Sequence, residues 1–307
     1  MAFSVAKTPD LTGKVALVTG GNIGLGFETV KAIASRGAHT FLAARNPQKG
    51  QSAVAALLKE NPKAKITFLE LDLASLRSVR AAAESFSSAN EKLDILVNNA
   101  GIMAMPERQT EDGFESQFGV NHLGHWTLTG LLLSKILQSS APRVVTVTSS
   151  AHHLVKGIDF ENPHLRGKYS PWNAYSQSKL ANYFFSLGIA EIFENQKHPG
   201  LSLLAHPGLA HTNLQVETYD QGASGVAGTI SKYLAAKVGQ EPANGALPQI
   251  RAALDSRAKN REFYAPRWFV SGKPVKRPFL RIGNQDNIEK LWALSERETG
   301  VKIPGII

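Results

Sequence analysis

Val-Ala-Leu-Val-Thr-Gly-Gly-Asn-Ile-Gly-Leu-Gly, residues 15–26, is the stretch that decides the fold. Its first four residues are apolar and partly β-branched, which is typical of a strand buried on both faces of a parallel sheet. After the glycine-rich turn, apolar residues recur at helical spacing from Phe27 to Ala34. A strand, a glycine turn and a helix together predict a site for a phosphate-bearing ligand. The helix N-terminus offers free N–H donors and the positive end of the dipole.

Glycines in this turn let the backbone bend tightly and approach a ligand where a Cβ would collide. The loop residues that we expect to contact the ligand are Gly20, Asn22, Ile23, Gly24 and Gly26. Three glycines alone also fit an ordinary strand-to-helix turn, so the rest of the chain has to support the interpretation.

Length and composition restrict the class of protein. The chain has 307 residues, 43% of them hydrophobic, and no cysteine. This length is near the upper limit for one compact domain, so we predict a single domain over residues 1–307. The lack of cysteine excludes disulfides and thiolate chemistry and fits a reducing compartment, so we expect a cytoplasmic protein. No signal peptide or apolar run long enough for a membrane anchor is visible.

The chain carries a formal net charge of +9. Most basic residues are spread along the sequence, and the one cluster lies in a basic C-terminal extension around 267–307. Such a charge could attract nucleic acid, but no groove-reading motif accompanies it, so we expect no nucleic-acid partner. It can equally steer a multiply charged cofactor to its site.

Apolar β-rich runs alternate with helical patterns along the chain. Strands are predicted at 14–19, 40–44, 66–71, 95–98, 144–148 and 201–206, with a weaker seventh at 262–265; helices are predicted at 24–36, 48–60, 76–87, 114–137 and 175–194. This alternation predicts an α/β protein with a doubly wound parallel sheet of about seven strands and helices on both faces. The glycine-containing segment around 209–240 is interpreted as a substrate loop or lid.

Three motifs occur in chain order: Thr19-Gly20-x-x-x-Gly24-x-Gly26, Asn98-Asn99-Ala100-Gly101 and Tyr175-x-x-x-Lys179. Together they resemble the short-chain dehydrogenase/reductase family over Leu11 to about Pro266, which implies a Rossmann fold that binds a nicotinamide dinucleotide. Ala151-His152-His153 and residues 177–182 resemble its retinol-dehydrogenase-like and carbonyl-reductase-like branch.

Tyr175 and Lys179 are the candidate catalytic pair. Residues i and i+4 share a helix face, so the phenol and the ammonium can converge. A nearby cation stabilises phenolate and lowers the tyrosine pKa, which lets Tyr175 exchange a proton with a substrate oxygen. Between two adjacent serines we choose Ser150 to polarise that oxygen, because the family uses the second of such a pair. The resemblance gives Asn121 the role of holding a water in line with Lys179.

Arg45 follows the second predicted strand, where an acidic residue would bind the ribose of NAD. A cation there favours the 2′-phosphate of NADP(H), although it also fits an exposed arginine in a turn. Asp72 fits either an adenine contact or a helix N-cap, a role for which Ser75 competes. The resemblance adds further cofactor contacts, namely Leu73, Asn99, Ala100, Gly101, Tyr175, Lys179, Pro207, Gly208 and Thr212.

Histidines occur in close pairs, but no acidic or cysteine partner is grouped with them at a recognised spacing, so we expect no metal. Apolar residues in the expected substrate segments favour a lipophilic alcohol or carbonyl compound; they are Met103, Met105, Phe160, Trp172 and Leu214.

These observations predict an NADP(H)-dependent oxidoreductase that interconverts an alcohol and a ketone or aldehyde. One alternative is a C=C reductase related to protochlorophyllide reductase, a branch that depends on a cysteine absent here. Another is a non-catalytic NADPH-sensing interaction protein, against which the intact set of catalytic residues argues. The sequence leaves open whether the chain forms the helix-to-helix homodimer common in the family.

Overall fold

The computed structural model describes residues 3–209, 240–280 and 284–305, and its strands form one eight-stranded sheet in the order β3-β2-β1-β4-β5-β6-β7-β8. The strands are β1 (Val15–Thr19), β2 (His39–Ala44), β3 (Lys65–Glu70), β4 (Ile95–Asn98), β5 (Arg143–Val147), β6 (Leu201–Ala205), β7 (Glu262–Pro266) and β8 (Pro274–Arg277). Neighbouring strands are parallel except β7 and β8. The doubly wound parallel sheet predicted from the sequence is confirmed.

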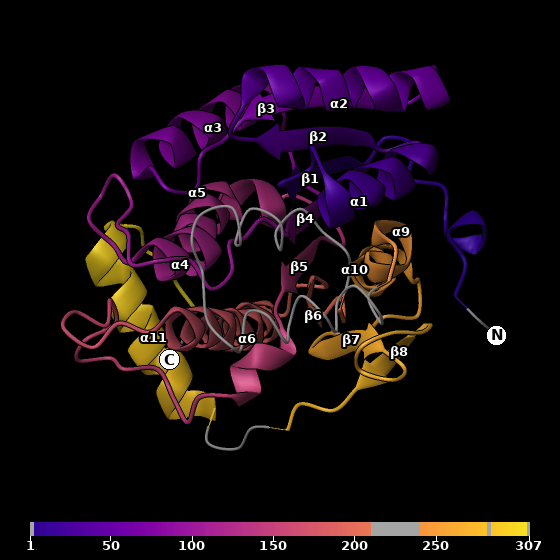
Figure 1. Cartoon of the computed structure of the whole chain (residues 1–307). Helices are drawn as coiled ribbons and strands as arrows, with labels where there is room; N and C mark the ends of the chain where they lie inside the picture. Colours follow the sequence, from indigo (N-terminus) through magenta and orange to yellow (C-terminus); the bar gives the residue numbers. More distant parts are fainter. Residues whose placement is uncertain (1–2, 210–239, 281–283, 306–307) are drawn as a thin grey trace.

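Side chains alternate between two apolar layers, as the pleat of buried strands requires. Leu17 points to one layer, and Ala16 and Val18 point to the other. The first layer contains α3 (Leu76–Ala89), α4 (Ser116–Phe118), α5 (Gly124–Leu137), α6 (Pro171–Asn195) and α11 (Asn284–Thr299); the second contains α1 (Gly24–Ser35), α2 (Pro47–Glu60), α9 (Pro242–Gly245) and α10 (Leu247–Leu254) (Figure 1).

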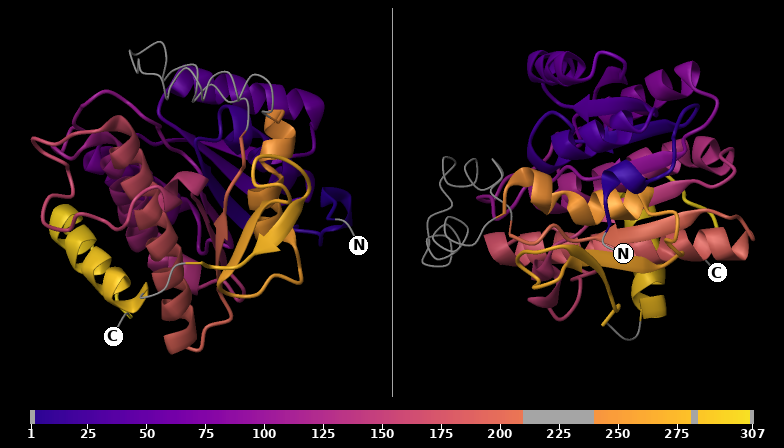
Figure 2. Two further views of the ribbon diagram at one scale, coloured as in Figure 1. Left: turned by 60° about the horizontal axis from the view of Figure 1, so that its bottom comes forward. Right: turned by 90° about the vertical axis from the view of Figure 1, so that its right-hand side faces the viewer.

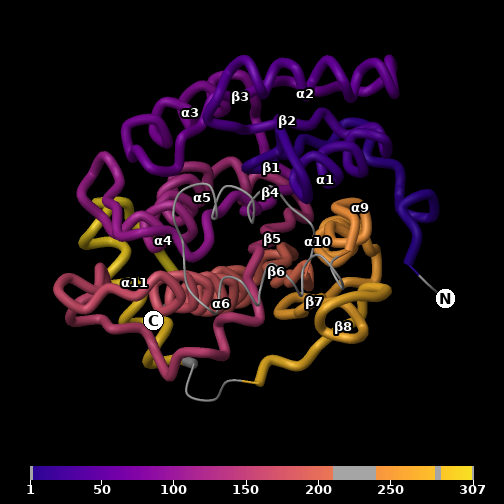
Figure 3. The backbone as a smooth tube through the Cα atoms, in the orientation of Figure 1, coloured from indigo at the N-terminus to yellow at the C-terminus, as the bar shows by residue number. Residues whose placement is uncertain are grey.

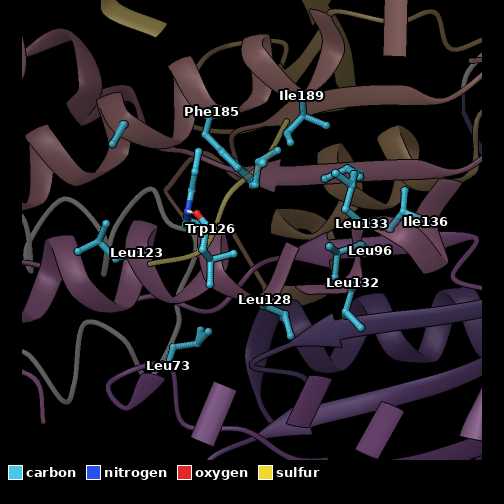
Figure 4. Close-up of a cluster of buried hydrophobic side chains, with 14 of the residues drawn as sticks. Leu73, Leu96, Leu123, Trp126, Leu128, Leu132, Leu133, Ile136, Phe185 and Ile189 are labelled. Carbon is cyan, nitrogen blue, oxygen red and sulfur yellow. Dashed lines mark hydrogen bonds between the residues drawn. The ribbon is translucent and has the colours of Figure 1, made fainter. Parts of the chain in front are cut away.

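The first layer holds the larger core, built around Trp126 on α5 (Figure 4). Trp126 packs edge-on against Trp292 of α11 at 4.8 Å between ring centroids and also contacts Phe185 of α6. The two indole N–H groups donate to the carbonyls of Val301 and Ile303. These bonds fix the segment after α11, and α11 itself lies against α6 (Figure 2).

The second layer is completed by the N-terminal 3-10 turn η1 (Val5–Lys7), which lies beside α10 (Figure 3). Phe3 and Val5 pack against this core. No helix in the three described ranges is long and apolar enough to cross a bilayer.

Three sequence expectations differ from the structure. The helix predicted over 114–137 is interrupted by a π-helix, η2 (Gly119–Leu123), between α4 and α5. The helix predicted from Tyr175 begins one turn earlier, because Pro171 occupies its first position, where a missing N–H costs nothing. The eighth strand lies inside the predicted basic extension; it is a four-residue edge strand that starts with proline and gives little sequence signal.

Most of the predicted lid, residues 210–239, lies outside the described residues.

Asp94 joins the amino ends of three strands. Its carboxylate accepts hydrogen bonds from the backbone N–H of Val15 (2.9 Å), the hydroxyl of Ser139 (2.7 Å) and the ammonium of Lys14 (3.0 Å). Its backbone carbonyl accepts from the N–H of Arg143. Burial alone would raise the pKa of Asp94, but these donors hold it below its ordinary value.

We expect Asp94→Asn to destabilise the protein at neutral pH by about 2–3 kcal/mol, because it removes the charge that three donors face. A depressed pKa stabilises the fold above the unfolded-state pKa, and this contribution is lost as pH falls through the folded-state value. The difference between variant and wild type in urea unfolding should therefore shrink below about pH 4.

Asp286→Asn is the matched control, because Asp286 is exposed and, among the described residues, forms an ion pair only with Lys290 one turn along α11. It should change stability by less than about 0.5 kcal/mol. Equal losses in the two variants, or a loss in Asp94→Asn that persists in acid, would contradict the account.

Candidate active site

The carboxyl ends of β1, β4, β5 and β6 meet at one edge of the sheet, and strand order reverses between β1 and β4. Open α/β sheets bind ligands at such a reversal. The residues predicted from the sequence follow these strand ends, so the fold brings them to one region.

The glycine loop between β1 and α1 has the geometry of an anion site. Gly20 and Gly24 have positive φ, 64° and 57°. A Cβ on Gly26 would lie 2.1 Å from the carbonyl oxygen of Gly20, so only glycine allows the first turn of α1 to lie against this loop. The N-cap, Ile23, gives no side-chain hydrogen bond, and the first turn of α1 contains no acidic residue. The donors at this end of α1 are therefore left for a ligand.

Thr19 connects the turn after β4 to the glycine loop by hydrogen bonds. Its hydroxyl accepts from the backbone N–H groups of Asn99 and Ala100, both at 2.9 Å. The side-chain amide of Asn99 donates to the Thr19 carbonyl at 2.7 Å and accepts from Gln249 of α10. Asn99 thus fixes the floor of the site with its side chain, and its backbone remains next to the glycine loop.

Arg45 and Asp72 follow β2 and β3. Arg45 is exposed, and its guanidinium makes no hydrogen bond or ion pair with the described residues. The Asp72 carboxylate accepts from the N–H of Ala74 at 2.9 Å, and Ser75 is the N-cap of α3, so Ser75 takes the capping role that the sequence left open. Leu73 is buried in the core, which leaves only its backbone for a ligand (Figure 4).

Asn121 lies in the π-helix η2, and its side chain is fully engaged. Its amide oxygen accepts from the N–H of Ile102, while its amide nitrogen donates to the Ile102 carbonyl and to Ser178. The carbonyl of Asn121 accepts from Nδ1 of His125 at 3.0 Å. Asn121 thereby ties the segment after Gly101 to α6.

His125 links this carbonyl to the glycine loop, because its Nε2 lies 2.8 Å from the Thr19 hydroxyl. Since that hydroxyl already accepts two N–H groups, it donates its proton to Nε2, and Nδ1 carries the ring proton. Burial lowers the pKa of His125 to about 4, so the ring is neutral. The sequence analysis treated His125 only as a metal candidate; its spacing gives no sign of this link.

Tyr175 and Lys179 lie one turn apart on α6, and both are buried. The Lys179 ammonium lies 5.8 Å from the centre of the Tyr175 ring and donates to the carbonyl of Val147 at 3.3 Å. A Cβ on Gly101 would lie 2.9 Å from the Asn121 amide oxygen and 3.2 Å from the Lys179 nitrogen. Residues from β4, η2 and α6 therefore converge on one point.

Burial controls both ionisations. It raises the pKa of Tyr175 to about 12, although a hydrogen bond from Ser149 opposes the rise, and it lowers the pKa of Lys179 to about 8. The sequence analysis expected the lysine to lower the tyrosine pKa. The cost of burying a phenolate is instead the largest influence on the tyrosine pKa.

Ser149, rather than Ser150, is the serine beside Tyr175. Its hydroxyl bonds to the Tyr175 side chain and accepts from the N–H of Ala151 as the N-cap of η3 (Ser150–His153). Ser150 begins that 3-10 turn with an exposed side chain. Ser150, the serine chosen from the sequence, is thus not the one hydrogen-bonded to Tyr175, because η3 begins at Ser150 and turns the chain directly after β5.

The turn after β6 is held by the loop between β7 and β8. Gly208 has φ 77°, and a Cβ there would lie 2.6 Å from the carbonyl oxygen of Val270. The N–H of Leu209 donates to that carbonyl, and the Gln240 amide donates to the carbonyl of Pro207. Thr212, the last predicted cofactor contact, lies outside the described residues.

No cluster of three metal-binding side chains is found in residues 3–209, 240–280 or 284–305. Burial lowers the pKa of His122 to about 3 and that of His206 to about 4, so both rings are neutral.

Residues 14–161 match the sequence profile of the family described as short chain dehydrogenase. The chain is 37% identical to the polyprenol dehydrogenase of Mus musculus, with 97% of this chain and 87% of that protein covered. It is 35% identical to retinol dehydrogenase 13 of Homo sapiens, with 96% and 87% covered. A crystal structure of an uncharacterized protein from Mycobacterium paratuberculosis is 36% identical, with a TM-score of 0.77 and 99% and 100% of the two chains covered.

We expect Gly26→Ala to destabilise the protein by about 1–3 kcal/mol, because the added methyl group overlaps the Gly20 carbonyl and has to displace the loop. Thermal unfolding measures this loss. Gly157→Ala is the control, since a Cβ there meets no atom within 4 Å. Unchanged stability of Gly26→Ala would show that the loop does not need this close approach.

Proposed function

The chain belongs to the short-chain dehydrogenase/reductase family, in which it is retinol-dehydrogenase-like, and we propose that it is an NADP(H)-dependent oxidoreductase that interconverts a lipophilic alcohol and its ketone or aldehyde. Membership of this family shows that the chain belongs to the oxidoreductases. The cofactor preference, the substrate class and the roles of individual residues are the proposal. The observation that carries it is that the buried Tyr175 side chain is hydrogen-bonded to Ser149 and has the Lys179 ammonium 5.8 Å from its ring centre.

The glycine loop and the uncapped N-terminus of α1 fit the pyrophosphate of a dinucleotide, because a side chain at Gly26 would fill the cradle. Arg45 suits the extra phosphate of NADP(H), since a guanidinium binds phosphate through two parallel hydrogen bonds. Asp72 and the backbone of residues 99–101 complete the proposed binding surface. When bound, the nicotinamide would supply or accept the hydride.

Tyr175 is the proposed proton donor and acceptor. Its raised pKa keeps the hydroxyl protonated at neutral pH, the state that carbonyl reduction requires. Ser149 would donate a hydrogen bond to the substrate oxygen as negative charge develops there. The Lys179 ammonium would stabilise the phenolate after proton transfer, and in alcohol oxidation it would favour the ionised base. Asn121 and His125 hold the backbone around this pair.

A lipophilic substrate is supported by two observations. Trp172 lies edge-on to Tyr175, with 6.1 Å between ring centroids, so an aromatic side chain borders the ring of the proposed proton donor. Two relatives are named for retinol and polyprenol, both long apolar alcohols. A cytoplasmic location also belongs to the proposal, and the absence of cysteine supports it.

Loss of NADPH absorbance with a panel of apolar aldehydes and ketones tests the activity. Tyr175→Phe should lower kcat/KM at least about 100-fold, because the proton donor is removed. Ser149→Ala should lower kcat about 10- to 100-fold through loss of one hydrogen bond to the developing charge. Ser150→Ala is the matched control and should behave like wild type. Full turnover by Tyr175→Phe, or a loss confined to Ser150→Ala, would reject the assigned roles.

Arg45→Ala should reduce the preference for NADPH over NADH about 10- to 100-fold, the range expected for a lost charge-assisted hydrogen bond. The ratio of kcat/KM for the two cofactors measures this preference. Lys59→Ala, an exposed basic residue on α2, is the control for net charge. An unchanged ratio in Arg45→Ala would remove this residue from the cofactor site.

A further inference from the structure

The hairpin between β7 and β8 exposes large apolar side chains. Trp268 is 69% exposed and Phe269 is 49% exposed. Leu154, which follows η3, is 71% exposed. Side chains of this size usually pack inside a protein, and neighbouring exposed ones mark an interaction site.

Backbone hydrogen bonds fix the turn that carries these side chains. The N–H of Trp268 donates to the carbonyl of Ser271, that of Phe269 to Pro266, and that of Arg267 to Lys273. Gly272, at φ 104°, leaves room for the indole, since a Cβ there would lie 3.1 Å from the Trp268 ring. The exposed rings thus project from a hydrogen-bonded turn, so little backbone freedom is lost when they are buried in a partner.

Positive charge surrounds the same side chains. Residues 263–280 contain four basic residues and no acidic one. Lys276 pairs with Glu262 of β7, while the Arg267 guanidinium lies 5.6 Å from the Trp268 ring centre and that of Arg277 lies 4.4 Å from the Phe269 ring centre. Cations and aromatic rings therefore alternate on one surface.

This surface borders the candidate active site. The hairpin carbonyl of Val270 accepts from Leu209, and the side chain of His206 bonds to the backbone of Phe269. His206 is also close enough to His153 for the two rings to interact electrostatically, and Leu154 is the next residue along the chain. The exposed rings and Leu154 thus lie around the end of β6, at the same edge of the sheet as the catalytic pair.

We propose that Leu154, Arg267, Trp268, Phe269 and Lys273 form a docking surface for an anionic lipid bilayer. Trp and Phe prefer the membrane–water interface, where rings enter the acyl boundary and neighbouring cations contact anionic headgroups. A nucleic acid could use the cations and stack its bases on the rings, but it would leave the aliphatic Leu154 without a partner, whereas a bilayer accommodates all of these side chains. Docking in this orientation brings the edge with Tyr175 to the bilayer, so an apolar substrate can pass between bilayer and protein.

Binding to phospholipid vesicles tests the proposal on the full chain without cofactor, so the result is independent of the proposed catalysis. Vesicles of phosphatidylcholine with about 30% phosphatidylserine should sediment the protein at least about tenfold better than pure phosphatidylcholine, because anionic lipids attract the cations. Trp268→Ser with Phe269→Ser should lower the affinity at least about tenfold. Thermal unfolding would check that this variant remains folded.

A charge-reversed pair separates local from global electrostatics. Arg267→Glu with Lys273→Glu should abolish the preference for phosphatidylserine, whereas Lys59→Glu with Lys63→Glu, which changes net charge equally on exposed residues near α2, should retain it. If both double variants lost the preference for phosphatidylserine equally, the preference would depend on net charge alone, and the proposal would be overturned.

Tryptophan fluorescence gives a signature that unspecific binding would not produce. Trp126 and Trp292 are buried and Trp172 is half-buried, so the part of a blue shift that Trp268→Phe removes reports insertion of Trp268. Trp268→Phe should keep the affinity and lose that shift. Vesicle binding by the wild type without a blue shift would contradict the proposed lipid-binding surface. So would stronger binding to duplex DNA than to vesicles, or a wild-type dimer that becomes a monomer in Trp268→Ser.

Discussion

The buried ammonium of Lys179 is the constraint on which the site depends. Its side chain is 5% exposed, and burial lowers its pKa to about 8. A charge in that position needs a polar partner, and the Val147 carbonyl accepts a hydrogen bond from it. The same charge helps to keep the buried rings of His125 and His206 neutral. In the proposed function, the phenol of Tyr175 is then the titratable partner that exchanges a proton with the substrate.

The sheet provides this geometry because several strands end at one edge. Thr19, at the end of β1, joins the turn after β4 to His125 on α5, and His125 holds the carbonyl of Asn121. Asp94 fixes the opposite ends of the same strands. The glycine loop and the proposed catalytic pair, Tyr175 and Lys179, are therefore parts of one hydrogen-bonded framework rather than separate motifs.

Much of this arrangement could be predicted from sequence, because buried parallel strands and glycine turns have strong local patterns. Seven strands, the glycine loop and the Tyr175–Lys179 spacing on one helix were predicted correctly. Three features depend on contacts that no local pattern reports. Ser149 faces Tyr175 because η3 begins directly after β5, His125 bridges two elements, and β8 is a short edge strand. The rise in the Tyr175 pKa likewise depends on burial by distant residues.

The ionisation of Tyr175 with a dinucleotide bound tests the central claim most directly. Phenolate absorbance can be titrated against pH in wild type and in Tyr175→Phe, with saturating oxidised NADP, and the difference assigned to this residue. The account predicts that the pKa of Tyr175 falls from about 12 in the free protein to below about 10, the value of free tyrosine, and that Lys179→Met abolishes the fall. A pKa that stays near 12 with the dinucleotide bound would contradict the account.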